Sequence, residues 1–145
     1  MHTIKNKQKV LFICTGNSCR SQIAEGLLKN MANSQFKVYS AGSHPSHVHP
    51  NAITVMKEKN IDISQNTSDS IDKYSSIGIN IVITVCDNAR EVCPVLNENV
   101  KRIHWSIKDP FDGWNSNNSG INKFRETRDE IESYINQFIN GEKKQ

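Results

Sequence analysis

Apolar residues along this chain fall into short continuous runs and into longer segments in which they recur every three or four positions. Continuous runs predict buried strands, and the three-to-four spacing predicts amphipathic helices. We expect strands at 9–13, 36–40, 79–85 and 100–106, and helices at 21–33, 51–60 and 121–139. The first helix should bury one face, which carries Ile23, Leu27, Leu28 and Met31.

The alternation of strands and helices predicts the α/β class, an open, mostly parallel four-stranded sheet with helices on both faces. At 145 residues with 36% hydrophobic content, the chain is long enough for a single domain over residues 1–145. In sheets of this kind, ligands bind beyond the carboxyl ends of the strands. Polar residues that directly follow the strands are therefore the first candidates for a site.

The segment after the first strand, here called the anion loop (residues 14–21), is the most informative of these. It reads Cys-Thr-Gly-Asn-Ser-Cys-Arg-Ser. The five residues between Cys14 and Arg20 have short side chains, so successive backbone N–H groups can line a concave anion nest. The helix that follows adds the positive end of its dipole. The candidate oxyanion-binding residues are Thr15, Gly16, Asn17, Ser18, Cys19, Arg20 and Ser21.

The chemistry of a thiol in such a nest favours nucleophilic catalysis. A free cysteine has a pKa of about 8.5, and an electropositive nest can lower a thiol pKa to roughly 3.5–7.5. Arg20 can offer a planar fork to two substrate oxygens, and the Ser21 hydroxyl can donate a hydrogen bond to a Cys14 thiolate. A buried structural cysteine does not explain the small residues that follow it. A nucleotide-binding loop would end in Gly-Lys-Ser/Thr, which is missing.

Composition and charge narrow the functional classes. The net charge is +3 without a dense Lys/Arg stripe, which argues against nucleic-acid binding. There is no apolar run near 18 residues and no signal peptide, so we expect a cytoplasmic protein without a membrane partner. In that compartment the four cysteines predict catalytic, redox or metal chemistry better than secreted-type disulfides.

Cys86 and Cys93 form a second group, which follows the third expected strand. In a continuous helix, residues seven apart would have Cα atoms about 10.5 Å apart, whereas a disulfide needs less than about 7 Å. We therefore hypothesise a redox switch in which residues 86–93 rearrange on oxidation. Zinc ligands usually lie two to four residues apart, and the cysteine gaps here do not match. Two inert core cysteines are the remaining alternative.

Asp109 follows the fourth expected strand, directly before Pro110. Asp before Pro is common in plain turns. On the same sheet edge as Cys14, however, its carboxyl could protonate a leaving oxygen, so we predict a general acid. Three histidines cluster between the second strand and the second helix, at positions 44, 47 and 49, and we interpret them as surface residues rather than metal ligands.

Several motifs together resemble a known family, the thioredoxin-coupled arsenate reductases, which share the low-molecular-weight protein tyrosine phosphatase fold. The motifs are Cys-Thr-Gly-Asn-Ser-Cys-Arg-Ser-Gln-Ile-Ala-Glu-Gly (14–26), Tyr-Ser-Ala-Gly (39–42), Thr-Ser-Asp (67–69), Cys86 with Cys93-Pro94, and His104-Trp105 before Asp109-Pro110. The resemblance runs over nearly the whole chain. Its most specific element is the anion loop combined with the later cysteine pair, since the loop alone fits either branch.

The resemblance implies a three-cysteine relay. Cys14 would attack arsenate held by the loop and Arg20, while Asp109 protonates the departing oxygen. Cys86 would then attack the Cys14 adduct, which releases arsenite and leaves a disulfide. Cys93 would take over the oxidised pair at the surface, and thioredoxin would reduce it.

The resemblance also implies how the rest of the site is built. Cys19 has no place in the relay, so structural burial is its expected role. No organic cofactor is expected, and we expect a monomer. Some members of the family bind potassium near the loop. The matching positions here are Asn17, Ser40, Thr67 and Asp69, and all four can supply oxygen ligands.

Two departures from the family pattern bear on the alternatives. Phe111 stands where the phosphatase branch often carries aromatics that pack on a phenolic substrate, which keeps a phosphomonoesterase as the second hypothesis. His47 stands where relatives usually have glycine, which puts the contact of that loop with the site in question. A third hypothesis is a non-catalytic oxyanion-binding or thiol-redox sensor module, which would not need a proton donor such as Asp109.

Overall fold

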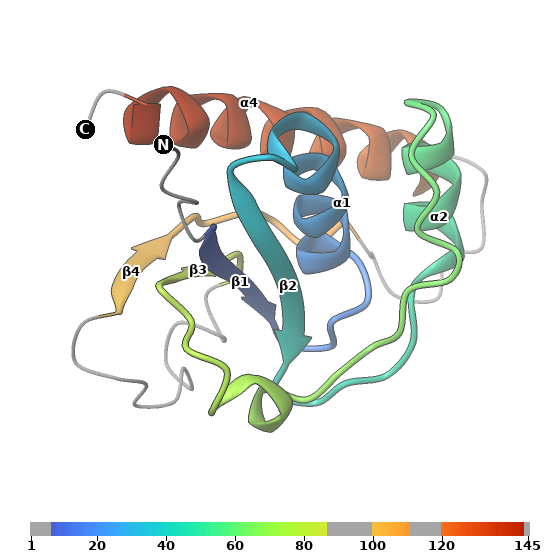
Figure 1. Cartoon of the computed structure of the whole chain (residues 1–145). Coiled ribbons are helices and arrows are strands. Elements are labelled where there is room, and N and C mark those ends of the chain that lie inside the picture. The colour runs from blue at the N-terminus through green and yellow to red at the C-terminus, as the bar shows by residue number, and fades with distance from the viewer. Residues whose placement is uncertain (1–6, 87–99, 111–119, 144–145) are drawn as a thin grey trace.

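The computed structural model describes residues 7–86, 100–110 and 120–143, and within these ranges its centre is a parallel sheet. The strands are β1 (Gln8–Cys14), β2 (Phe36–Gly42), β3 (Ile81–Thr84) and β4 (Lys101–His104). They pair in the order β2-β1-β3-β4, and every pair is parallel (Figure 1). The predicted α/β class and the four-stranded sheet are confirmed.

β1 lies in the interior of this sheet because its sequence is an unbroken apolar run. Val10 through Ile13 are completely buried, as expected for a strand with neighbours on both edges and both faces. In the pairing register, Cys14 lies opposite Gly42 of β2, and Ile13 lies opposite Thr84 of β3. The carboxyl ends of these three strands are therefore level, and the loops that follow them meet at one edge.

The described α-helices pack on one face of the sheet, and the short 3₁₀ helix Ile71–Tyr74 lies on the other (Figure 1). α1 (Arg20–Ala32) and α4 (Gly120–Lys143) cover one face, and α2 (Pro50–Lys57) packs beside them (Figure 1). Phe36 of β2 points to this side, where its ring lies 5.3 Å from Phe138 of α4. The side chain of Tyr39 points to the opposite face, where its ring lies 5.2 Å from that of Tyr74 in the short 3₁₀ helix Ile71–Tyr74.

Some expected boundaries differ from the structure for local reasons. The second helix was expected at 51–60, but α2 ends at Lys57, and Asn60 adopts a left-handed φ of 63° that no α-helix accommodates. The third strand is shorter than the apolar run that predicted it. Met31 was expected on the buried face of the first helix, and that prediction is wrong because its side chain is exposed.

A charged clamp joins α2 to α4. Arg125 and Arg128 of α4 both donate hydrogen bonds to the Glu58 carboxylate just after α2, and these bonds lower the pKa of Glu58 to about 2. Arg128 also donates to the carbonyl of Val55. No helix in the described ranges combines the length and apolar character needed to cross a bilayer.

Candidate active site

Cys14 ends β1 and points into a network of hydrogen bonds inside the anion loop. Its Sγ lies 2.9 Å from the Oγ of Ser21, in the first turn of α1. Asn17 donates its Nδ2 to the same Ser21 oxygen at 2.8 Å. Because that N–H occupies a lone pair of the hydroxyl, the hydroxyl proton is available to the sulfur. The arrangement supplies a hydrogen-bond donor to a thiolate at position 14.

Four consecutive carbonyls of the anion loop, from Thr15 to Ser18, are held from outside the loop. The carbonyls of Thr15, Gly16 and Ser18 accept backbone N–H groups from residues 44, 46 and 49 at 2.8, 3.1 and 2.9 Å. The Asn17 carbonyl accepts from Gln22 and Ser68. In a trans peptide, the N–H of the next residue points opposite to the carbonyl. The N–H groups of residues 16–19 therefore face the concave side, which makes the predicted anion nest.

Asn17 holds the sharpest bend of this loop. Its φ is 47°, in the left-handed region that asparagine tolerates better than most residues. The side chain is completely buried, and its Oδ1 accepts the backbone N–H of Asp69 at 2.8 Å. Asn17 thus connects the loop backbone, the Ser21 hydroxyl and the segment 67–69.

Gly42, at the end of β2, lets the loop pack against the neighbouring strand. A Cβ at this position would lie 2.6 Å from the carbonyl oxygen of Thr15 and 2.8 Å from the backbone nitrogen of Asn17. Both contacts are with backbone, so no side-chain rotation could relieve them. Only glycine fits here without displacing the loop.

Helix α1 directs its amino end at the nest. Cys19 precedes the helix without a side-chain cap, and the first turn holds no acidic residue. The first N–H groups of the helix are therefore left for an anion. Burial, followed by the nearby Cys14, raises the pKa of the Cys19 thiol well above its usual value. Cys19 is thus a neutral thiol near pH 7, in keeping with the expected structural role.

Arg20 and Asp109 form the outer wall of the site. Arg20 donates Nη1 to the carbonyl of Ile107 at 2.9 Å, and its Nη2 lies 3.6 Å from the Asp109 carboxylate. The Arg20 side chain is 13% exposed, whereas that of Asp109 is 52% exposed. The arginine is therefore positioned by protein groups, while the carboxyl stays open to solvent and to a bound substrate.

Cys86 reaches the same edge from the neighbouring strand β3. Its side chain is buried, and its Sγ lies 3.4 Å from the Oγ1 of Thr15 in the anion loop. Cys14 and Cys19 are free thiols. Cys93 and Phe111 lie outside the described residues, so the redox switch expected over 86–93 stays a prediction.

An oxygen-rich cluster lies behind the loop. Thr67 donates its hydroxyl to the Asp69 carboxylate, and Ser40 donates to Glu25 of α1. Burial, then Asp69 and Glu25, raise the pKa of Tyr74, so both carboxylates lie within electrostatic reach of one phenol. Glu25 was missed in the sequence, although a charged residue between buried neighbours of a helix is a usable signal.

The histidine segment contacts the anion loop mainly through its backbone N–H groups. His44 and His47 are exposed, as expected, but His49 is half-buried and its Nδ1 caps α2 by accepting the N–H of Asn51. Its ring also lies 4.7 Å from that of Phe124. Within the described part of the chain, no three His, Cys, Asp or Glu side chains are grouped to hold a metal ion.

Comparison with known proteins gives consistent results at the level of family and structure. The model of the low molecular weight phosphotyrosine protein phosphatases matches residues 9–145. An arsenate reductase of Halalkalibacterium halodurans is 44% identical over 133 residues, which cover 92% of this chain and 96% of that protein.

Solved structures extend the comparison. An arsenate reductase in its oxidized state has a TM-score of 0.79 at 33% identity and covers 92% of this chain and 98% of its own. A thioredoxin-dependent arsenate reductase of Corynebacterium glutamicum has a TM-score of 0.75 at 28% identity. That alignment covers 96% of this chain and 63% of the other chain.

Proposed function

Because the chain belongs to the low molecular weight phosphotyrosine protein phosphatase family, in the branch of its arsenate reductase relatives, we propose that it reduces arsenate to arsenite. The observation that carries the proposal is the pair Cys14 and Cys86 at one sheet edge. Cys14 accepts a hydrogen bond inside an anion nest, and Thr15 of that nest contacts the Cys86 sulfur. A phosphatase needs the nest and the first thiol, but it has no use for the second.

The first step forms a bond between the Cys14 sulfur and arsenic. The anion nest and Arg20 hold the arsenate oxygens, and the N–H groups of residues 16–19 stabilise the negative charge that develops on them. One arsenic–oxygen bond breaks, and the departing oxygen leaves as water after taking a proton from Asp109. The position of Asp109, 3.6 Å from Arg20 and open to solvent, supports this role.

The second step is the reduction itself. The Cys86 thiolate attacks the Cys14 sulfur, a disulfide forms, and the sulfur–arsenic bond breaks with its electron pair going to arsenic. Arsenic(V) becomes arsenic(III) and leaves as arsenite, while the two cysteines lose two electrons. The burial of both sulfurs on neighbouring strands supports the attack, because neither residue has to cross the sheet to meet the other.

Regeneration requires a third thiol and an external dithiol. We propose that Cys93 attacks Cys86, frees the Cys14 thiolate and leaves a Cys86–Cys93 disulfide. The two thiols of thioredoxin would then reduce that disulfide and become a disulfide themselves. The support is the presence of Cys93 in the sequence and the likeness to a relative described as thioredoxin-dependent.

A potassium ion behind the loop is part of the proposal. The oxygen atoms of Asn17, Ser40, Thr67 and Asp69, together with Glu25, would hold it. The donor set fits, since hard oxygen ligands and two carboxylates suit a hard cation. Lys29 pairs with Glu25 and Lys73 pairs with Asp69. The potassium ion would therefore neutralise only the part of the carboxylate charge that these two ammonium groups leave. The midpoint temperature of thermal unfolding should then be higher in KCl than in choline chloride of equal ionic strength. Equal midpoints would refute the site.

The decisive experiment measures arsenate-dependent NADPH oxidation with thioredoxin and thioredoxin reductase, beside a glutaredoxin-coupled control. Cys14→Ser should abolish turnover. Cys93→Ser should release one arsenite per chain without NADPH oxidation, because the Cys14–Cys86 disulfide cannot be passed on. Repeated turnover by Cys93→Ser would refute the relay, and activity with glutaredoxin alone would refute the thioredoxin coupling.

A phosphomonoesterase is the second candidate, favoured by the family model and by the Cys14, Arg20 and Asp109 geometry. It would use the same nest and proton donor without Cys86 or Cys93. Hydrolysis of a small aryl phosphate by the Cys93→Ser variant measures it directly. Wild-type hydrolysis that greatly exceeds arsenate reduction would make the phosphatase the principal activity.

A further inference from the structure

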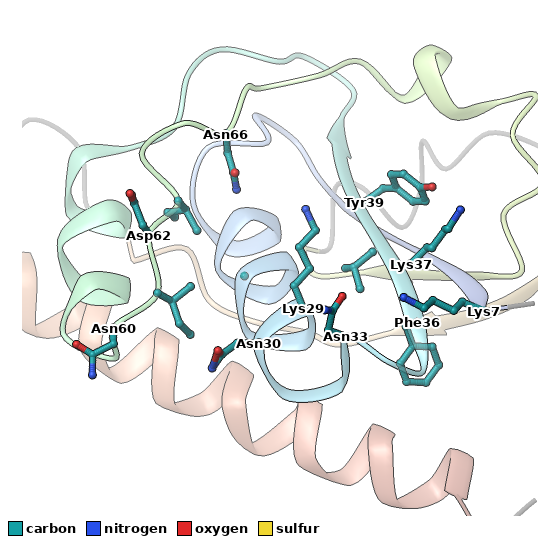
Figure 2. Close-up of a pocket in the computed structure, with 14 residues that line it drawn as sticks. Lys7, Lys29, Asn30, Asn33, Phe36, Lys37, Tyr39, Asn60, Asp62 and Asn66 are labelled. Atoms are coloured by element: carbon teal, nitrogen blue, oxygen red, sulfur yellow. The ribbon is translucent and has the colours of Figure 1, made fainter.

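A groove lies along the outer edge of β2, away from the anion loop. It has a volume of about 600 Å³ and is bounded by α1, by β2 and by the segment 60–66 (Figure 2). We call it the edge groove. Its lining includes none of residues 14–21, nor Cys86, nor Asp109. The proposed arsenate chemistry therefore assigns it no role.

The backbone of β2 forms one wall of the edge groove with its hydrogen-bonding edge. β2 is the terminal strand of the sheet, and four consecutive residues, 36–39, line the groove. Gly42 directs its N–H outward, to the carbonyl of Asp69 at 2.8 Å. Backbone direction alternates along a strand, so Phe36, Val38 and Ser40 also direct N–H and C=O groups outward, although each of these residues is at most 5% exposed overall. Among the described residues, no backbone partner pairs with those three on that side.

A partner strand therefore already begins at Gly42 and does not continue. The bridge between Gly42 and Ser70 is parallel and isolated, so the residues that precede Ser70 do not pair with the β2 residues that precede Gly42. The remaining outer edge of β2 is long enough for about three residues of a further strand to pair. An extended peptide is the ligand whose backbone complements such an edge.

The charges around the edge groove favour a peptide with a net negative charge. Lys7, Lys29 and Lys37 line it, whereas Asp62 is the one carboxylate among its described lining residues. Figure 2 shows the Lys29 side chain rising in the middle of the groove, with Lys37 and Lys7 at the β2 end. Lys29 is already paired with Glu25 at 2.5 Å, which leaves Lys7 and Lys37 as the stronger attraction for an incoming anion.

We propose that the edge groove docks an extended acidic peptide segment of a partner protein, which adds a strand to the outer edge of β2. Its backbone pairs with Phe36, Val38 and Ser40, and its carboxylates meet Lys7 and Lys37. Side-chain amides from Asn30, Asn33, Asn60 and Asn66 line the rest of the groove and can bond the polar groups of the peptide. A second copy of this chain is a poor occupant, because pairing β2 with β2 would bring the same lysines together.

The competing account is that the lysines only protect an exposed edge from unwanted pairing, as lysines on edge strands often do. The two accounts differ in what they predict for an acidic strand. Protection predicts no saturable binding of any extended peptide. Docking predicts binding that depends on both the charge and the extended backbone of the probe.

The test uses the full chain and fluorescein-labelled octapeptides at low ionic strength. The main probe alternates glutamate and valine, a second alternates lysine and valine, and a third carries two central prolines in the acidic probe. Fluorescence polarization should show saturable binding of the first probe and none of the second. The proline probe should bind at least about fivefold more weakly, because proline removes backbone donors.

Variants and hydrogen exchange locate the binding. Lys37→Glu should weaken the acidic probe about fivefold or more, whereas Lys101→Glu, the same change on the opposite edge strand β4, should not. The amides of Val38 and Ser40 should exchange more slowly when the probe is bound. Equal losses in both lysine variants, or binding without amide protection, would overturn the proposal. Arsenate reduction by Lys37→Glu should equal wild type, so this test is independent of the proposed activity.

Discussion

The anion loop and the edge groove sit at opposite sides of β2 and are built in contrasting ways. In the loop, all four carbonyls from Thr15 to Ser18 accept hydrogen bonds from other segments, and Asn17 is completely buried. In the groove, exposed lysines and amides surround a strand edge that lacks a backbone partner among the described residues and whose own residues are buried. Hydrogen bonds from other segments therefore hold the loop without a ligand, whereas the groove is lined by long side chains with several rotatable bonds.

This difference predicts which substitutions should affect the function of each region. A preorganised nest gains its catalytic power from fixed donors, so displacement by a fraction of an ångström matters. A groove that relies on charge and an open backbone edge tolerates shape changes but responds to charge reversal. Measuring arsenate reduction and peptide binding on the same variants separates the two regions.

Apart from removal of a relay cysteine, the largest effect is expected from removal of the proton donor. Asp109→Asn should lower kcat for arsenate by about 10²–10⁴, because the leaving oxygen loses its general acid. Asp62→Asn is the matched control, since it removes a carboxylate from the edge groove and should leave arsenate reduction unchanged. Coupled NADPH oxidation measures both. Wild-type rates in Asp109→Asn would remove Asp109 from the mechanism.

The next effect tests the close packing of the loop on β2. In Gly42→Ala the new Cβ would meet backbone atoms of the loop at 2.6 and 2.8 Å, so the loop must move. We expect kcat/KM for arsenate to fall roughly 10²-fold and the free energy of unfolding to fall by about 1–3 kcal/mol. Peptide binding in the edge groove should persist.

Gly120→Ala is the control for that substitution, since no atom lies within 4 Å of its would-be Cβ. It should change neither kcat/KM nor the unfolding midpoint by more than a small fraction of the Gly42→Ala effect. If both alanine variants behave alike, the loop does not depend on the close approach at Gly42.

A smaller effect is expected at the hydroxyl beside the nucleophile. Ser21→Ala removes the hydrogen bond at 2.9 Å from the Cys14 sulfur, and we expect about a tenfold loss in kcat for arsenate. Alkylation of Cys14 by iodoacetamide at pH 6 should slow by a similar factor, because the thiolate loses a donor. Ser76→Ala, at an exposed turn residue, should alter neither rate.

The smallest effect concerns the segment that holds the loop. Burial, and then His47, lower the pKa of His49 below its usual 6.5. The unfolded chain therefore takes up this proton more readily than the folded one, so acid favours unfolding. The contribution of neutral His49 to the free energy of unfolding should be complete above about pH 6.5. It should be lost as the pH falls through the lower pKa that His49 has in the folded chain.

His49→Asn tests this pH dependence, since asparagine keeps a cap for α2 but does not titrate. Unfolding midpoints of wild type should fall more steeply than those of the variant between pH 7.5 and 5. Glu58, whose pKa is about 2, adds its own loss only below its usual 4.5 and does not interfere. Parallel pH curves for the two proteins would show that His49 does not contribute.

Much of the fold follows from local patterns in the sequence. The apolar run at 9–13 predicted β1, and the three-to-four spacing after Ser21 predicted α1, because strand and helix periods leave distinct traces. The 3₁₀ helix Ile71–Tyr74 was missed, since four residues are too short to show a period. Met31 was misplaced because its position on the helix lies outside the face that meets the sheet.

The site was predictable only where side chains reveal it. Cys14, Arg20 and Asp109 carry recognisable chemistry, and the structure brings all three to one edge. The steric demand at Gly42 was not predictable, because it depends on how closely two segments pack. The cytoplasmic location and the monomeric state stay predictions.

The hydrogen bonds that hold the anion loop from a neighbouring segment determine which substitutions that segment can accept. Residues 44, 46 and 49 hold the loop through main-chain N–H groups, which every amino acid except proline provides. Substitutions in this segment can therefore accumulate without loosening the nest, provided that the chain keeps its course. His47 is an exposed residue of this segment, and other side chains at that position should leave the nest beneath it unchanged.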